Sequence, residues 1–435
     1  MTKQTHEEKM AVLLRLVKNE VDKCIRCGEC RTVCPVFDDT PSERYTARGK
    51  IAIAESLARG DLEFNGHTRE LFDNCLLCTG CASQCSSGAR ADKVVIAVRE
   101  AFADEMGVPA LKKAVAETLS LPRAVLDAGA RIGSVAQRLA FKGVPGTSGL
   151  YRRFAMPGVD KEQYVPQLAA KSFRNEVRFS GKPGQPRVVF FTGCMTNYSM
   201  TEIGHSLVKV LNGLGVSVEV PQEQACCGMP MLASGEADVV RKQAERNVKA
   251  LANDGDDVAI VTACASCGHM LKHGYLDRFG DDGELAAGLR NIAERTLDIS
   301  EYLMTRVDRE RLEGLLEKKA PVSATYHDPC HLRKAQKIVK EPRAVLEMAT
   351  GGPVNEMRRP EACCGLGGTY CLANMERSKR IQAKKIDDAA ATRADVMATA
   401  CPGCILQLRD GIRRNVGTDM PVKHVIQLLA EAMKK

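Results

Sequence analysis

Cysteines at fixed spacings constrain the fold of this chain more than any other feature. The chain has 435 residues and 19 cysteines, and 18 of the cysteines fall into four groups with regular spacing. Disulfide frameworks are typical of short secreted chains, whereas this chain is long and shows no signal peptide. We therefore expect reduced thiols that bind metal, in a cytoplasmic protein.

The first two groups are runs with the C-x-x-C-x-x-C-x-x-x-C spacing of two-cluster bacterial ferredoxins. The residues are Cys24, Cys27, Cys30 and Cys34 in the first run, and Cys75, Cys78, Cys81 and Cys85 in the second. Pro35 follows the first run as is usual, whereas Ser86 follows the second. The spacing predicts two 4Fe-4S clusters with crossed ligation, in which the fourth cysteine of each run serves the cluster of the other run. Structural zinc sites are the alternative, but they would not need the third and fourth cysteines of each run.

The other two groups are copies of one pattern, a single cysteine, then a Cys-Cys-Gly, then a C-x-x-C. The first copy contains Cys194, Cys226, Cys227, Cys264 and Cys267, and the second contains Cys330, Cys363, Cys364, Cys401 and Cys404. The two copies are offset by 136 or 137 residues throughout, which indicates an internal duplication. An adjacent cysteine pair forms a strained disulfide, so metal ligation is the more natural use of these thiols. The alternative is that one copy is a structural relic with inert thiols.

Short β-rich runs precede the cysteines in both copies. They are 187–192, 216–220 and 258–262 in the first copy, and 322–326 and 396–399 in the second. Expected helices at 239–251 and 377–389 alternate with these runs, which predicts parallel sheets. Ligands of such sheets gather at the carboxyl ends of the strands, so the five cysteines of one copy can converge on one site.

These patterns predict a multidomain α plus α/β protein. We expect an α-helical ferredoxin domain over residues 1–100, with a helix at 47–57, and a helical segment and linker over 101–186. The duplicated α/β domains are expected over 187–310 and 320–435. Apolar residues recur at helical spacing between 102 and 141, and they suit either packing against the cluster domain or a docking face for a partner.

Charge and hydropathy exclude several functional classes. The formal net charge is +8, but basic and acidic residues are interspersed, aromatic residues make up only 4% and tryptophan is absent. We therefore expect no nucleic-acid partner, and anionic clusters would offset much of the positive charge. No apolar run approaches the roughly 18 residues of a membrane span, so we expect no transmembrane segment.

The Cys-Cys-Gly pattern resembles the CCG domain of heterodisulfide reductase subunits and of glycolate and lactate oxidase iron–sulfur subunits. The stretches 164–174 and 401–409 are also similar to segments of the lactate and glycolate oxidase subunits. The resemblance implies an N-terminal ferredoxin domain followed by two CCG domains, and one or two noncubane iron–sulfur clusters in those domains. Relatives of this kind transfer electrons between a flavin or quinone partner and a further acceptor.

The expected function is therefore that of an iron–sulfur subunit of a respiratory oxidoreductase. It would pass electrons from a flavoprotein 2-hydroxyacid (lactate or glycolate) dehydrogenase toward quinone or another acceptor, at the inner face of the cell membrane. The alternative is a heterodisulfide-reductase-like subunit that reduces a disulfide at CCG clusters, or a relay coupled to a membrane cytochrome. The sequence shows no nicotinamide or flavin fingerprint, so we assign no organic cofactor site and no catalytic residue.

Two histidines and one further cysteine lie among the cysteines of the second CCG copy. His327 and His331 flank Cys330, and we expect each to be hydrogen-bonded in the core or around the metal ligands, with cluster ligation or proton delivery as the alternative. Cys371 has no counterpart in the first copy, and it is expected to be a small buried residue.

Overall fold

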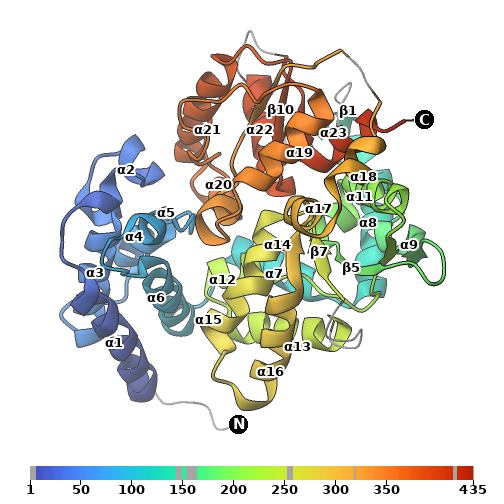
Figure 1. The fold of residues 1–435 in the computed structure, drawn as a ribbon. Helices are drawn as coiled ribbons and strands as arrows, with labels where there is room; N and C mark the ends of the chain where they lie inside the picture. Colours follow the sequence, from blue (N-terminus) through green and yellow to red (C-terminus); the bar gives the residue numbers. More distant parts are fainter. Residues whose placement is uncertain are drawn as a thin grey trace. The chain divides into compact units, whose positions relative to one another are not determined.

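The computed structural model describes residues 6–143, 149–152, 164–251, 258–317, 320–414 and 419–434 (Figure 1). These residues form two compact units, each built from stretches that are distant in sequence. Unit 1 contains residues 1–117, 228–240 and 362–382, and unit 2 contains residues 118–227, 241–361 and 383–435.

Unit 1 is helical and is built mainly from the N-terminal hundred residues. Its helices are α1 (His6–Lys23), α2 (Pro35–Asp39), α3 (Ala47–Arg59), α4 (Gly66–Asp73), α5 (Gly80–Gln84) and α6 (Ala91–Met106), with short 3-10 turns at Glu29–Arg31 and Glu43–Tyr45. Helix α3 begins at the N-cap Thr46, whose side chain accepts a hydrogen bond from the Gly49 amide, and it ends at Gly60 in the left-handed conformation. Helices α1, α3 and α6 pack together, and Phe72 and Phe102 lie buried in the core that they form with α4.

Two segments from the duplicated region also belong to unit 1. The first carries α12 (Met229–Ser234), where the carbonyl oxygen of Ala233 accepts a hydrogen bond from Arg99 of α6 at 2.9 Å. The second carries α20 (Tyr370–Ala373) and the start of α21 (Met375–Ala390). Arg377 and Arg380 of α21 form ion pairs with Asp39 of α2, at 3.2 and 2.7 Å. The ferredoxin-like helices are therefore tied to parts of both repeats.

Unit 2 contains two parallel sheets, one from each repeat. The first sheet has the strand order β4-β6-β5-β7-β8, and only β4 is antiparallel to its neighbour. Its strands are β4 (Phe179–Ser180), β5 (Arg187–Phe191), β6 (Ser217–Glu219), β7 (Ile260–Thr262) and β8 (Thr296–Asp298). The second has the order β11-β10-β9, from β9 (Ala324–Tyr326), β10 (Val396–Thr399) and β11 (Val422–His424). Strand β5 is buried beyond its first residue, as expected for a parallel strand covered on both faces.

Helices follow most of the strands of unit 2. In the first repeat they are α10 (Gly193–Tyr198), α11 (Thr201–Gly213), α13 (Ala237–Leu251), α14 (Ala265–His269), α15 (Tyr275–Phe279), α16 (Gly283–Arg295), α17 (Ile299–Arg306) and α18 (Arg309–Gly314). In the second they are α19 (Lys340–Thr350), α22 (Pro402–Arg414) and α23 (Val425–Ala432). Each repeat also has one π-helical turn, at Met270–Gly274 in the first and at His331–Ala335 in the second. The predicted class, helical first and α/β in the two repeats, is confirmed.

The stretch expected as a linker contains regular structure where it is described. Strands β1 (Phe141–Gly143), β2 (Gly149–Arg152) and β3 (Val165–Pro166) form a small antiparallel sheet, and α9 (Phe173–Glu176) precedes β4. Residues 144–148 and 153–163 of the expected linker lie outside the described residues. The predicted domain boundaries remain predictions.

Helix α8 (Arg123–Ala140) exposes apolar side chains where we expected them to pack. The exposed fraction is 70% for Ile132 and 76% for Leu139, and Val125 and Val135 are about half exposed. The four residues lie at helical spacing on one face of α8. Packing against the cluster domain and docking of a partner both remain predictions for this face. Among the described residues, no helix is both long and apolar enough to cross a membrane.

Candidate iron–sulfur centres

The eight N-terminal cysteines line two neighbouring cavities in unit 1. One cavity is lined by Cys24, Cys27, Cys30 and Cys85, and the other by Cys34, Cys75, Cys78 and Cys81; Cys81 also borders the first. All 19 cysteines lie within the described residues, and none of them forms a disulfide. The fourth cysteine of each run thus lies with the first three of the other run, as crossed ligation requires.

The backbone turns in the same way between the cysteines of both runs. Arg26 and Gly28 have positive φ values of 57° and 92°, and Leu77 and Thr79, at the equivalent positions of the second run, have values of 50° and 55°. Side chains other than glycine rarely adopt this left-handed conformation, which costs on the order of 1 kcal/mol each. Strain of this kind persists where a bound group over-determines the loop, so the loops fit cluster binding.

Basic residues that sequence reasoning missed border both cavities, Lys50 at the Cys34 cavity and Arg26 and Arg48 at the other. Lys50 of α3 lines the Cys34 cavity, is only 2% exposed, and donates a hydrogen bond to the Tyr45 carbonyl oxygen. Arg48 lines the other cavity and donates to the Arg26 carbonyl oxygen at 2.9 Å. A buried cation such as Lys50, which has no carboxylate partner among the described residues, fits a site that holds an anionic cluster.

Burial and crowding shift the pKa values of several thiols in unit 1. Burial raises the pKa of Cys34 to about 11, and burial together with Cys75 and Cys78 raises the pKa of Cys81 well above its usual value. The pKa of Cys85 is lowered, because hydrogen bonds from Ser87 and from the Ala89 amide outweigh the effect of burial. Bound iron would replace the protons of these thiols, so the crowding that is unfavourable for free thiolates suits a metal centre.

The five cysteines of the first repeat converge in unit 2. The pKa of Cys194 is raised well above its usual value, first by its hydrogen bond with Cys226 and then by burial. The pKa of Cys267 is raised likewise, first by hydrogen bonds with Cys227 and Cys264. The contacts therefore link the single cysteine to the Cys-Cys pair and the Cys-Cys pair to the C-x-x-C.

Two glycines allow this convergence. Gly193 has a φ of 67°, and a Cβ atom at this position would lie 2.8 Å from the Cys267 Sγ. The glycine that follows the cysteine pair also needs a left-handed backbone in both repeats, since Gly228 has a φ of 82° and Gly365 a φ of 93°. The third residue of the Cys-Cys-Gly pattern is therefore set by backbone conformation.

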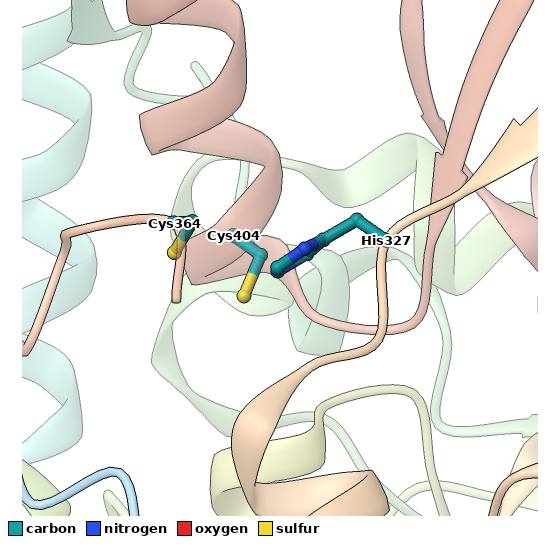
Figure 2. Close-up of side chains that lie close together, drawn as sticks. All are labelled: His327, Cys364 and Cys404. Carbon is teal, nitrogen blue, oxygen red and sulfur yellow. The ribbon is translucent and has the colours of Figure 1, made fainter. Parts of the chain in front are cut away.

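The second repeat divides its cysteines between the units. Cys330, Cys401 and Cys404 belong to unit 2, whereas Cys363 and Cys364 belong to unit 1. Convergence of these five residues therefore remains a prediction. Within unit 2, His327 and Cys404 have ligand atoms within 4.8 Å of each other, and Figure 2 shows the His327 ring directed toward the Cys404 side chain.

The C-x-x-C segments of the two repeats meet inside unit 2. The Cys401 pKa is lowered well below its usual value by hydrogen bonds with Cys264 of the first repeat and then with Cys404. Close by, the Ser266 hydroxyl lies 3.1 Å from the His331 Nδ1, and the rings of His269 and His331 stack with centroids 4.8 Å apart. His331 therefore contacts polar groups beside the cysteines, as expected.

A pocket of about 550 Å³ in unit 2 reaches the first set of CCG cysteines. Cys194 and Cys226 form part of its wall, together with apolar residues at the end of α7 (Ala110–Ser120) and the start of α8. Arg174 is buried in this wall, and burial lowers its pKa, while Arg246 and Lys249 add positive charge at the more exposed side. The first centre is thus accessible to an anionic group from outside unit 2.

The structure corrects two interpretations of single residues. Cys371, expected to be buried, is only partly buried, and its thiol donates a hydrogen bond to the Gly368 carbonyl oxygen at 3.3 Å. His327 is buried as expected, but both of its ring nitrogens lack a hydrogen-bond partner among the described residues. Hydrogen bonding within the core therefore does not explain His327.

Comparison with known proteins identifies both cysteine regions. The cysteine-rich CCG domain family matches residues 188–272 and 324–409, and the 4Fe-4S dicluster domain family matches residues 20–89. The probable glycolate oxidase iron–sulfur subunit of Bacillus subtilis is 28% identical over 96% of this chain and 95% of that protein. A subunit of the dihydromethanophenazine:CoB–CoM heterodisulfide reductase of Methanosarcina mazei is 27% identical over 95% of this chain and 94% of that protein.

A shorter relative matches little more than half of the chain. Lactate utilization protein A 2 of Bacillus cereus is 29% identical over 57% of this chain and 100% of its own length. The full-length relatives and the matched domains account for both the ferredoxin-like run and the repeats. With two CCG domains behind a 4Fe-4S dicluster domain, the chain belongs to the CCG-domain iron–sulfur subunits of oxidoreductases.

Proposed function

We propose that this chain is the electron-transfer subunit of a flavoprotein 2-hydroxyacid dehydrogenase, of the lactate or glycolate type. The observation that carries the proposal is that one chain holds several groups of cysteines suited to one-electron centres. Unit 1 has two cavities, each lined by four thiols, and unit 2 has a set of five cysteines that converge. The whole-length similarity to a probable glycolate oxidase subunit and the similarity to a lactate utilization protein support the substrate class.

The proposed ligands are all 18 grouped cysteines. One cubane is assigned to Cys24, Cys27, Cys30 and Cys85, and the other to Cys75, Cys78, Cys81 and Cys34. The first CCG centre is assigned to Cys194, Cys226, Cys227, Cys264 and Cys267, and the second to Cys330, Cys363, Cys364, Cys401 and Cys404. Bound iron–sulfur clusters supply one-electron chemistry.

The protein residues control the charge and the solvent around these centres. Lys50 and Arg48 provide positive charge beside the two cavities of unit 1, where reduction would add negative charge. In unit 2, Cys264 and Cys401 bring the two repeats into direct contact, which supports a short path between their centres.

A chain of one-electron centres needs a donor and an acceptor. We propose a flavoprotein subunit as donor and a quinone-reactive or cytochrome subunit at the inner face of the cell membrane as acceptor. The exposed apolar face of α8, at Val125, Ile132, Val135 and Leu139, supports the binding of another subunit. A cytoplasmic location peripheral to the membrane belongs to the same proposal.

A disulfide reductase is the second candidate, and one observation favours it. The 550 Å³ pocket that reaches Cys194 and Cys226 would admit a small anionic substrate to the first centre, whereas a pure relay has no need of such access. The similarity to the heterodisulfide reductase of Methanosarcina mazei extends over nearly the whole chain, so the comparison is equally consistent with this candidate.

Dye-linked assays separate the two candidates. We expect the purified chain alone to leave an acceptor dye unreduced with lactate or glycolate, and to support dye reduction once its flavoprotein partner is added. A disulfide reductase would instead take electrons from a reduced dye and cleave a disulfide without any partner.

The decisive variant is Cys227→Ser combined with Cys364→Ser, with Cys371→Ser as the matched control outside the proposed ligand sets. Loss of a partner-independent disulfide reductase activity in the double variant, with intact cubane signals, would overturn the dehydrogenase proposal. Partner-dependent lactate or glycolate oxidation, with no disulfide cleavage by the wild type, supports it.

A further inference from the structure

His327 differs from its counterpart in the first repeat. The offset of 136 residues that relates Cys194 to Cys330 also relates Phe191 to His327. Phe191 ends β5, His327 directly follows β9, and both side chains are fully buried, with exposed fractions of 0% and 1%. The fold thus accepts an apolar ring at this position, so packing alone does not require an imidazole.

Burial of this imidazole without a hydrogen bond is costly. The structure describes no hydrogen-bond partner for Nδ1 or Nε2 of His327 in the part of the chain that it covers. A buried polar group left unpaired keeps the full cost of its lost hydration. The His327 amide donates to the Ala398 carbonyl oxygen of β10 at 2.9 Å, so the backbone that carries the ring is held in the sheet. The uncompensated nitrogens therefore indicate a binding partner beyond the described protein atoms.

The surroundings of the ring fit a metal as that partner. Cys404 offers its Sγ within 4.8 Å of a His327 ring nitrogen (Figure 2), a separation that two ligands of one iron atom can adopt. The contact is not a hydrogen bond between the two side chains. Cys364, drawn in the same view, belongs to unit 1.

We propose that His327 is a nitrogen ligand of the second CCG centre, which makes the two CCG centres chemically different. This proposal rests on the proposed function, which assigns Cys404 to that centre. At the equivalent position the first repeat has Phe191, whose side chain cannot bind a metal. Replacing an anionic thiolate environment by a neutral imidazole raises the reduction potential of an iron centre. The second centre would then have the higher potential of the two.

Isotope-edited spectroscopy tests the ligand directly. The full-length protein is purified anaerobically with ¹⁵N-labelled histidine, and pulsed EPR measures nitrogen couplings in the reduced state. We expect a strong coupling of a directly bound nitrogen in the wild type. We expect its loss in His327→Phe, which copies the first repeat and should therefore fold, and its retention in His205→Gln, which changes an exposed histidine paired with Glu176.

A redox titration gives the second measurement. His327→Cys should keep the iron content and shift the potential of one CCG centre downward, because a thiolate replaces the imidazole. The proposal is overturned if the wild type shows no directly bound histidine nitrogen, or if the coupling survives in His327→Phe. An iron content no greater than the two cubanes need would instead count against the assignment of CCG centres itself, so the two failures can be distinguished.

Discussion

The substitution Lys50→Met removes the positive charge beside one cubane cavity while keeping a long buried side chain. Lys50 lines the cavity of Cys34, Cys75, Cys78 and Cys81 and is almost inaccessible to solvent. Burial lowers the pKa of its ammonium group, and the thiols of Cys75, Cys34 and Cys81 oppose this by favouring the charged form. A cluster that becomes more negative on reduction would be stabilised by this cation.

The size of the effect follows from the Coulomb energy. A unit charge roughly 5 to 6 Å from the added electron, at an effective dielectric constant of about 20, contributes about 3 kcal/mol. For a one-electron couple, 1.4 kcal/mol corresponds to about 59 mV. Lys50→Met should therefore lower the midpoint potential of the adjacent cluster by on the order of 100 mV.

EPR-monitored redox titration of the anaerobic protein measures both cubane potentials. One potential should fall in Lys50→Met, the other should change by much less, and neither should change in Lys18→Met, an exposed lysine of α1. Arg48→Met should move the other cluster, and by less, because Arg48 is more accessible to solvent. Equal potentials in the wild type and Lys50→Met would refute the electrostatic role of Lys50.

Three further predictions concern single residues. Cys34→Ser should damage the cluster of the second cysteine run rather than that of its own run, and loss of only the first run's cluster in EPR spectra would reject crossed ligation. Hydrogen bonding from Arg380 lowers the pKa of Asp39 to about 2. The ionised Asp39 carboxylate therefore stabilises the fold fully above pH 4, and this stabilisation is lost only as the pH falls through about 2. Asp39→Asn should therefore lower the free energy of unfolding by roughly 2 kcal/mol at every pH from 6 to 9, and urea unfolding that shows no loss would contradict this. Gly193→Ala should reduce the iron bound by the first CCG set, because its Cβ would meet the Cys267 Sγ at 2.8 Å in a strained backbone; unchanged iron content would count against the tight convergence.

The cysteine spacings predicted most of the fold because each spacing carries a local geometric requirement. The runs before Cys194 and Cys264 form strands β5 and β7, and the run before Cys401 forms β10. These strands are short and apolar, and a cysteine follows each of them. The apolar run therefore predicts a buried strand, and the cysteine after it marks the end of the strand where a ligand would lie. The positive φ of Gly228 and Gly365 explains why the motif ends in glycine.

Other features depend on contacts that spacing cannot reveal. Lys50 lies on an amphipathic helix, where a lysine is usually solvated, and only the fold places it beside thiols. The attachment of 362–382 to the ferredoxin-like helices depends on Arg377 and Arg380 meeting Asp39, more than 300 residues away in sequence. The unpaired nitrogens of His327 likewise follow from three-dimensional surroundings.

The measurement that tests the central claim most directly is the iron content of the fully loaded, anaerobically purified chain. Two cubanes need about eight iron atoms. Because both CCG sets keep all five cysteines, we predict substantially more than this number, and we predict that Cys227→Ser combined with Cys364→Ser lowers the count toward it while the cubane EPR signals persist. A wild-type content of eight or fewer, with both cubane signals at full intensity, would contradict the assignment of metal centres to the CCG domains.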